Sequence, residues 1–213
     1  MNLRTTTALF LLTASFARGD SAGVLGSVPI TRVAAAPIAV EKYSGSISGR
    51  VNPAPSRIAG VWLESPATRA MPAGTARMEQ AGYQFRTALL VVQTGTRVDF
   101  PNRDEDYHNV FSLSKTKRFD LGRYRKDESP AAVVFDKPGV VRLFCEIHQH
   151  MRSVVLVVDS PYFTTTDESG RFQLRGVPAG NYTLKAWLDE KHTWEQPVTV
   201  ARGRGVEVAL VEK

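Results

Sequence analysis

Hydrophobic residues along this chain form short runs or strict alternations, and helical periodicity is nearly absent. The runs are bounded by glycine, proline, asparagine and aspartate, which is typical of β-strands joined by tight turns. The pattern predicts an all-β protein with strands at 45–51, 60–64, 76–79, 88–93, 97–100, 108–113, 131–135, 139–145, 154–159, 171–174, 180–188, 195–201 and 205–210.

Two changes in composition divide the chain. Residues 65–75 are rich in proline, alanine and small polar residues, and Ser160-Pro161 ends one strand before a different pattern begins. Residues 18–43 show no alternation and are predicted to form a linker. With 213 residues the chain is long enough for two small domains, each with its own core. The expected order is a leader at 1–17, the linker at 18–43, strands of one module at 44–65, a β-domain at 74–159 and the remainder of the module at 160–213.

The first residues have the layout of an export signal. Arg4 gives a short positive region, residues 8–17 are apolar, and Ser15 and Ala17 are small residues at the positions that a signal peptidase reads. No later run approaches the ~18 apolar residues of a membrane span. We therefore expect a cleaved leader and a periplasmic or otherwise extracytoplasmic protein without a membrane span.

The net charge of +6 comes without any motif that reads DNA or RNA, so a nucleic-acid partner is not expected. Residues 112–129 hold six basic side chains against three carboxylates. This run could dock an acidic redox partner, or it could be an ordinary solvated loop. The six basic residues are Lys115, Lys117, Arg118, Arg123, Arg125 and Lys126.

The stretch FCEIHQHM at 144–151 holds the only cysteine of the chain and two of its four histidines. A lone cysteine in an exported protein is either a buried thiol or a thiolate held by a metal. Cys145, His148 and Met151 have C-x-x-H-x-x-M spacing between two predicted strands, so one loop can turn all three toward one point. His108, at the start of an earlier strand, could supply a fourth ligand.

Two imidazoles, a thiolate and a thioether are the ligands of blue-copper sites. Zinc more often recruits further cysteines, histidines or carboxylates, and calcium and magnesium prefer oxygen. One type 1 copper ion is therefore the expected cofactor. His150 competes with His148 as a ligand, but the C-x-x-H spacing favours His148.

Three motifs within residues 76–159 resemble the cupredoxins: VVQTGTRVDFPNRD, HNVFS and FDKPGVVRLFCEIHQHM, the last with a ligand loop of amicyanin-like length. The resemblance implies a Greek-key β-sandwich in which His108, Cys145 and His148 are equatorial ligands and Met151 is axial. It also implies that Asn109 ties the two ligand-bearing loops together.

In the family, the exposed edge of the loop histidine is the electron port. The matching edge here is that of His148, with His150 beside it as a rim residue or secondary metal contact. Many cupredoxins carry a proline next to this histidine, whereas Ile147 and Gln149 flank it here.

The stretch DESGRFQLRGVPAGNYTLKAW resembles carboxypeptidase regulatory-like modules, which are small transthyretin-like β-sandwiches. Such a module opens with strands like SGSISGRV and AGVWLE, which occur at 44–64. We therefore expect the copper domain to be inserted into the module, with a simple tandem order as the alternative. The whole arrangement resembles methylamine-utilisation-type exported bacterial proteins.

These features predict an exported carrier of single electrons between redox partner proteins. An enzyme is not expected, because four protein ligands would leave no open position on the metal for a substrate. A carrier or sensor that binds Cu(I) for delivery is the alternative, since soft ligands suit Cu(I) equally well. The oligomeric state is not predicted.

Overall fold

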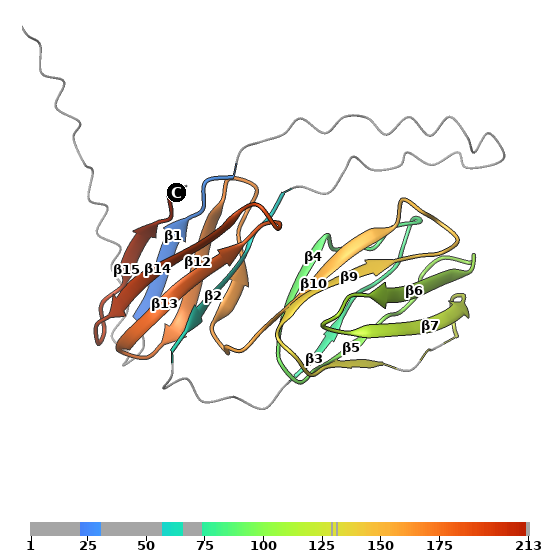
Figure 1. The fold of residues 1–213 in the computed structure, drawn as a ribbon, viewed down its shortest axis with the longest axis horizontal. Coiled ribbons are helices and arrows are strands. Elements are labelled where there is room, and N and C mark those ends of the chain that lie inside the picture. Colours follow the sequence, from blue (N-terminus) through green and yellow to red (C-terminus); the bar gives the residue numbers. More distant parts are fainter. Residues whose placement is uncertain (1–21, 31–56, 66–73, 129, 131, 212–213) are drawn as a thin grey trace, which may run out of the picture.

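The computed structural model describes residues 22–30, 57–65, 74–128, 130 and 132–211, and every regular element in these ranges is a β-strand. Figure 1 shows two β-sandwiches side by side. The predicted all-β class is confirmed. In these ranges no helix is long and apolar enough to cross a membrane.

The first sandwich consists of two sheets. One sheet has the order β4-β10-β9-β6-β7 and the other the order β3-β5-β8. The chain passes repeatedly from one sheet to the other. In the five-stranded sheet β4 pairs in parallel with β10, and β6 and β9 are antiparallel neighbours. The bounds are β3 (Thr75–Arg77), β4 (Leu89–Gln93), β5 (Thr96–Asp99), β6 (His108–Leu113), β7 (Arg118–Tyr124), β8 (Val133–Phe135), β9 (Gly139–Phe144) and β10 (Arg152–Val158).

Alternation along these strands builds the core between the two sheets. In β5, for example, Val98 is fully buried whereas Arg97 and Asp99 face outward. The edge strand β7 was not expected from the sequence, because polar residues alternate with only partly buried Phe119 and Leu121. Its place at the sheet edge explains why it needs so little apolar surface.

The second sandwich pairs the sheet β12-β1-β15 with the sheet β11-β2-β13-β14. Its core draws on both sheets, with Val24, Leu63, Leu174 and Leu184 almost completely buried. The bounds are β1 (Ala22–Ser27), β2 (Gly60–Glu64), β11 (Phe163–Thr165), β12 (Arg171–Val177), β13 (Gly180–Trp187), β14 (Thr193–Val200) and β15 (Val206–Ala209).

Strand β1 corrects the predicted linker at 18–43. Residues 22–27 pair with β12 and β15, and Val24 is fully buried. The stretch AGVLGS gives only a weak hydrophobic signal, because most of its residues are small. Gly26 must be small, since a side chain there would meet the backbone of Val208 and the ring of Phe172. The predicted strand at 45–51 and the leader at 1–17 lie outside the described residues.

Strands β2 and β11 are antiparallel neighbours in one sheet, although the whole first sandwich lies between them in sequence. Phe163 pairs with Trp62, and the amide of Leu63 donates to the carbonyl of Tyr162 at 3.0 Å. The first sandwich therefore leaves the second after β2 and returns to it at β11.

A third apolar cluster joins the two sandwiches. Leu89, Val91, Leu156 and Val158 on β4 and β10 pack against residues of the second sandwich. Gly60 permits this approach, because a Cβ there would lie 3.0 Å from a methyl group of Val91. An ion pair between Arg142 and Glu190 also links the two parts. The partners from the second sandwich are Ile58, Trp62, Phe163 and Trp187.

Candidate metal centre

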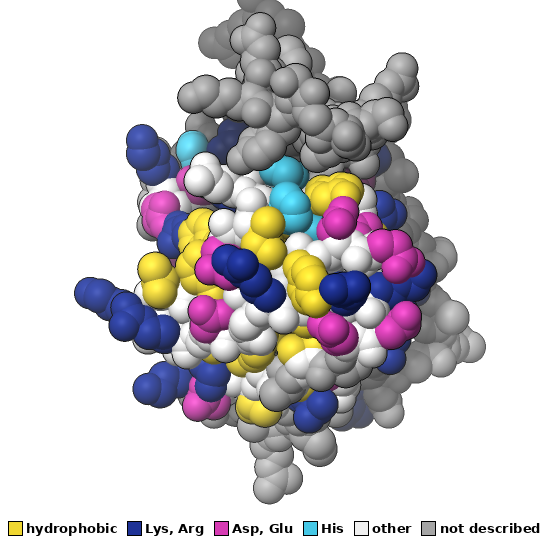
Figure 2. All heavy atoms as spheres, turned by 90° about the vertical axis from the view of Figure 1, so that its right-hand side faces the viewer, with side chains coloured by type: hydrophobic (Ala, Val, Ile, Leu, Met, Phe, Trp, Pro, Cys, Tyr) yellow, Lys and Arg dark blue, Asp and Glu magenta, His cyan; other side chains and the backbone are white. Residues whose placement is uncertain are grey.

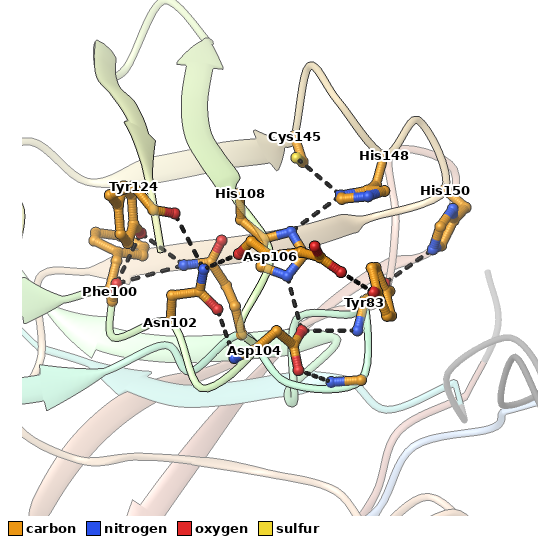
Figure 3. A network of polar contacts seen from close by, with 12 residues as sticks. Tyr83, Phe100, Asn102, Asp104, Asp106, His108, Tyr124, Cys145, His148 and His150 are labelled. Atoms are coloured by element: carbon orange, nitrogen blue, oxygen red, sulfur yellow. Dashed lines mark hydrogen bonds and ion pairs between the residues drawn. The ribbon is translucent and has the colours of Figure 1, made fainter. Parts of the chain in front are cut away.

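One end of the first sandwich brings His108, Cys145 and His148 together (Figure 3). His108 is the first residue of β6, and Cys145 directly follows β9. The ligand loop, residues 145–151, closes because Phe144 and Arg152 pair across β9 and β10. Within this loop the amide of Met151 donates to the carbonyl of His148 at 2.8 Å, which makes the turn that points His148 back toward β6.

The donor atoms of these three side chains all lie within 4.8 Å of one another. The Nδ1 atoms of His108 and His148 are 3.0 Å apart, and Cys145 Sγ is 3.9 Å from His148 Nδ1. His108 and Cys145 are buried, and His148 is half-buried. Three soft or borderline donors thus converge on one point, which is the arrangement a transition metal requires.

Asp104 fixes the orientation of His108. Its carboxylate lies 2.8 Å from His108 Nε2, so that nitrogen carries the proton that it donates. Nδ1 is thereby directed toward Cys145 and His148, as in the carboxylate–histidine pairs of metal sites. Sequence reasoning missed Asp104, although it lies four residues before His108 in the run NRDEDYH.

The electrostatics favour a thiolate beside a cationic imidazole. Burial raises the pKa of Cys145, but hydrogen bonds from His108 and from backbone amides, including that of Asn109, bring this pKa below its ordinary value. Burial lowers the pKa of His108, yet Cys145 and Asp104 together raise it above the ordinary value. Burial and the neighbouring His108 and His150 lower the pKa of His148, which therefore stays neutral and able to coordinate.

Met151 is buried beside the converging donors, whereas His150 lies at the surface. Met151 is 1 % exposed and belongs to the same core cluster as Cys145. His150 is exposed, and its Nε2 donates to the carbonyl of Tyr83 at 2.9 Å. Its ring centroid lies 6.1 Å from that of His148, outside the group of converging donors.

Asn109 connects β6, β7 and the ligand loop. Its Nδ2 donates to Asp120 at 2.7 Å and to the carbonyl of Gly122 at 3.1 Å, and its Oδ1 accepts from the amide of Glu146 at 3.4 Å. Since Asn109 follows His108 and Glu146 follows Cys145, these bonds join the two segments that carry His108 and Cys145.

The surface around the histidines carries charges of both signs (Figure 2). In the basic run at 112–129, Lys126 pairs with Glu105 at 2.6 Å and Lys117 pairs with Asp136 at 2.9 Å. Arg123 likewise pairs with Glu146 at 2.7 Å. Much of the basic charge of this run is therefore balanced within the molecule.

The fold and the site together define a protein of two β-sandwiches with a His₂Cys group at the end of one of them. Residues 152–211 match the family model of the carboxypeptidase regulatory-like domain. This match begins at the first residue of β10 and covers β11 to β15. It includes the stretch DESGRFQLRGVPAGNYTLKAW, whose resemblance to carboxypeptidase regulatory-like modules it confirms.

Among solved structures the chain is similar to amicyanin from Paracoccus versutus, with 23% identity, 46% of this chain and 97% of that chain covered, and a TM-score of 0.37. It is also similar to a purple cupredoxin from Nitrosopumilus maritimus, with 21% identity, coverage of 39% and 99%, and a TM-score of 0.34. A copper-containing nitrite reductase from Thermus scotoductus matches at 21% identity over 46% of this chain and 25% of that chain, with a TM-score of 0.37. None of the curated proteins matches this chain. The description of the fold therefore rests on its own strand pairings.

Proposed function

We propose that this protein is an exported type 1 copper protein that carries single electrons between redox partners. The observation that supports the proposal is the convergence of two imidazoles and one thiol within 4.8 Å at one end of the first sandwich. Copper bound there would supply a reversible one-electron couple. His108, Cys145 and His148 would hold the copper, and Met151, buried in the same core, would supply a fourth, weaker ligand.

The protein's own residues prepare this site before any metal arrives. Asp104 holds His108 with Nδ1 directed toward Cys145 and His148, and backbone amides favour the thiolate form of Cys145. Burial of His108, Cys145 and Met151 keeps water away and limits rearrangement between the two oxidation states. A full set of protein ligands leaves no position for a substrate, which supports a carrier rather than an enzyme.

The decisive experiment is to load the mature protein with Cu(II) and record its visible spectrum. We expect an intense thiolate-to-copper band that disappears in Cys145→Ser, while His150→Ala retains it. Tight Cu(I) binding with a colourless Cu(II) form would favour a copper carrier for delivery instead. Absence of stoichiometric copper binding would contradict both functions.

The mode of partner docking is a further part of the proposal. The half-buried edge of His148 would be the electron port, with His150 at its rim. Because basic and acidic side chains pair beside the site, as in Arg123–Glu146 and Lys126–Glu105, we propose a partner with a mixed-charge rather than a purely acidic docking surface. Export would follow from the leader at 1–17.

A further inference from the structure

Tyr83 has an unusual backbone conformation close to the metal centre. Its φ is 59°, which side chains other than glycine rarely adopt, and the preceding Gly82 has φ 64°. A strained backbone persists only where its surroundings hold it, and such positions gather at functional sites. Tyr83 lies in the loop between β3 and β4, far in sequence from His108 and His148.

The carboxylate of Asp104 holds this conformation. It accepts the amide of Gly82 at 2.8 Å and the amide of Tyr83 at 3.0 Å, while the same group accepts from His108. The loop is also closed on itself, since the amide of Ala81 donates to the carbonyl of Gln84 at 2.9 Å. One carboxylate therefore sets the position of the loop and of a ligand imidazole together.

The ring of Tyr83 lies against both ligand histidines (Figure 3). Its centroid is 5.7 Å from that of His108 at 90°, and 5.1 Å from that of His148 at 79°. Two further contacts hold the residue in place: its hydroxyl donates to Asp106, and its carbonyl accepts from His150. The ring is only partly exposed, so one of its faces or edges is directed at the imidazoles rather than at solvent.

We propose that Tyr83 is a positioning residue that closes the solvent side of the ligand histidines and controls the access of water and competing ligands to the metal. This inference rests on the proposed copper site for its functional meaning, but the closure itself is a property of the polypeptide. The Tyr83 ring lies beside the exposed edge of His148, so a redox partner that docks there would contact both residues. The backbone strain serves to direct the ring inward.

The first test uses the metal-free protein. Diethyl pyrocarbonate modifies accessible histidines, and mass spectrometry of peptides resolves His148 from His192, which serves as an internal reference in the second sandwich. Tyr83→Asn and Tyr83→Gly both remove the ring with residues that tolerate positive φ, so the loop can keep its backbone conformation. We expect His148 to be modified about tenfold faster in both variants, because the ring no longer shields it.

Two controls separate shielding from general loosening. Tyr83→Phe keeps the ring and loses only the bond to Asp106, so its rate should stay within about twofold of the original. Tyr107→Asn truncates a neighbouring exposed tyrosine whose hydroxyl binds Arg125 and should also leave the rate unchanged. Equal rates in Tyr83→Asn, Tyr83→Gly and the unsubstituted protein would overturn the proposal.

The second test uses the copper-loaded protein. Loss of the thiolate-to-copper band in excess EDTA should be about tenfold faster in Tyr83→Asn than in Tyr83→Phe. An unchanged rate of copper loss, in a protein that does bind copper, would refute control of access by Tyr83. A protein without any thiolate-to-copper band would refute the proposed function instead, and closure by Tyr83 would then be decided by the histidine modification alone.

Discussion

Replacing Asp104 by asparagine should destabilise the metal-free protein by an amount that can be worked out from its contacts. The carboxylate accepts three hydrogen bonds, from His108, Gly82 and Tyr83, at 2.8, 2.8 and 3.0 Å. An asparagine has one acceptor oxygen in place of two, so it can keep the bonds to His108 and Tyr83 only as neutral ones. The amide of Gly82 is exposed and can turn to water, whereas His108 is fully buried. We expect a loss of about 1.5–3 kcal/mol, the range for a hydrogen bond to a charged group.

The loss of stability in Asp104→Asn should depend on pH, because both Asp104 and His108 titrate. Burial raises the pKa of Asp104, but the amide of Tyr83, His108 and the amide of Gly82 together lower it below its ordinary value. The stability from this carboxylate is therefore present above about pH 4 and is lost as the pH falls through the lowered pKa. The pKa of His108 is raised, so the charged pair contributes below about pH 6.5 and fades as the pH rises through that raised value. The difference between the two proteins should be largest from about pH 4.5 to 6.5.

Urea unfolding followed by circular dichroism measures this difference across the pH range. Tryptophan fluorescence reports on the second sandwich and on its contact with the first, since Trp62, Trp187 and Trp194 lie on its strands and the first two pack against the first sandwich. Asp106→Asn is the matched control, because this exposed carboxylate binds the hydroxyl of Tyr83 and not His108. A loss below about 0.5 kcal/mol at pH 6, or a difference independent of pH, would refute the role assigned to Asp104.

Three further substitutions test the packing. Leu156→Ala should lower the free energy of unfolding, measured in urea, by about 2–5 kcal/mol, because Leu156 is 3 % exposed between the sandwiches. Val134→Ala, on an exposed strand face, should lower it by less than about 1 kcal/mol. Gly170→Ala should lower stability by about 1–3 kcal/mol more than Gly203→Ala; both glycines have positive φ, but only a Cβ at 170 meets the backbone of Val28. Tyr124→Phe should cost about 1–3 kcal/mol, since its hydroxyl bonds buried Gln80 at 2.6 Å and the carbonyl of Phe100 at 2.7 Å; no measurable loss would show that water replaces it.

The ligand loop could be predicted from the sequence because its geometry is local. Cys145, His148 and Met151 stand between two strands that pair with each other, so their spacing alone limits where they can point. His108 could be included because it begins a strand with a clear apolar pattern. The ligand roles of these residues remain predictions until a metal is bound.

The surroundings of the site could not be predicted in the same way. Three carboxylates stand together at 104–106, and no periodicity singles out Asp104 as the partner of His108. Tyr83 reaches the site through a backbone conformation that its residue type does not favour. Strand β1 was missed for a related reason, since small residues give a weak hydrophobic signal even where close packing requires them.

The connection of the first sandwich through β2 and β11 has a consequence for the order of folding. Ser160 donates to the carbonyl of Leu63, 97 residues away along the chain. Closing so long a loop in a disordered chain carries an entropy cost that grows with the logarithm of its length. Once the first sandwich has folded, its first strand, β3, and its last strand, β10, both lead toward the second sandwich (Figure 1). The disordered chain between β2 and β11 is then much shorter than the full sequence separation. We therefore expect the first sandwich to fold first, and the sheet containing β2 and β11 to be completed on it as a template.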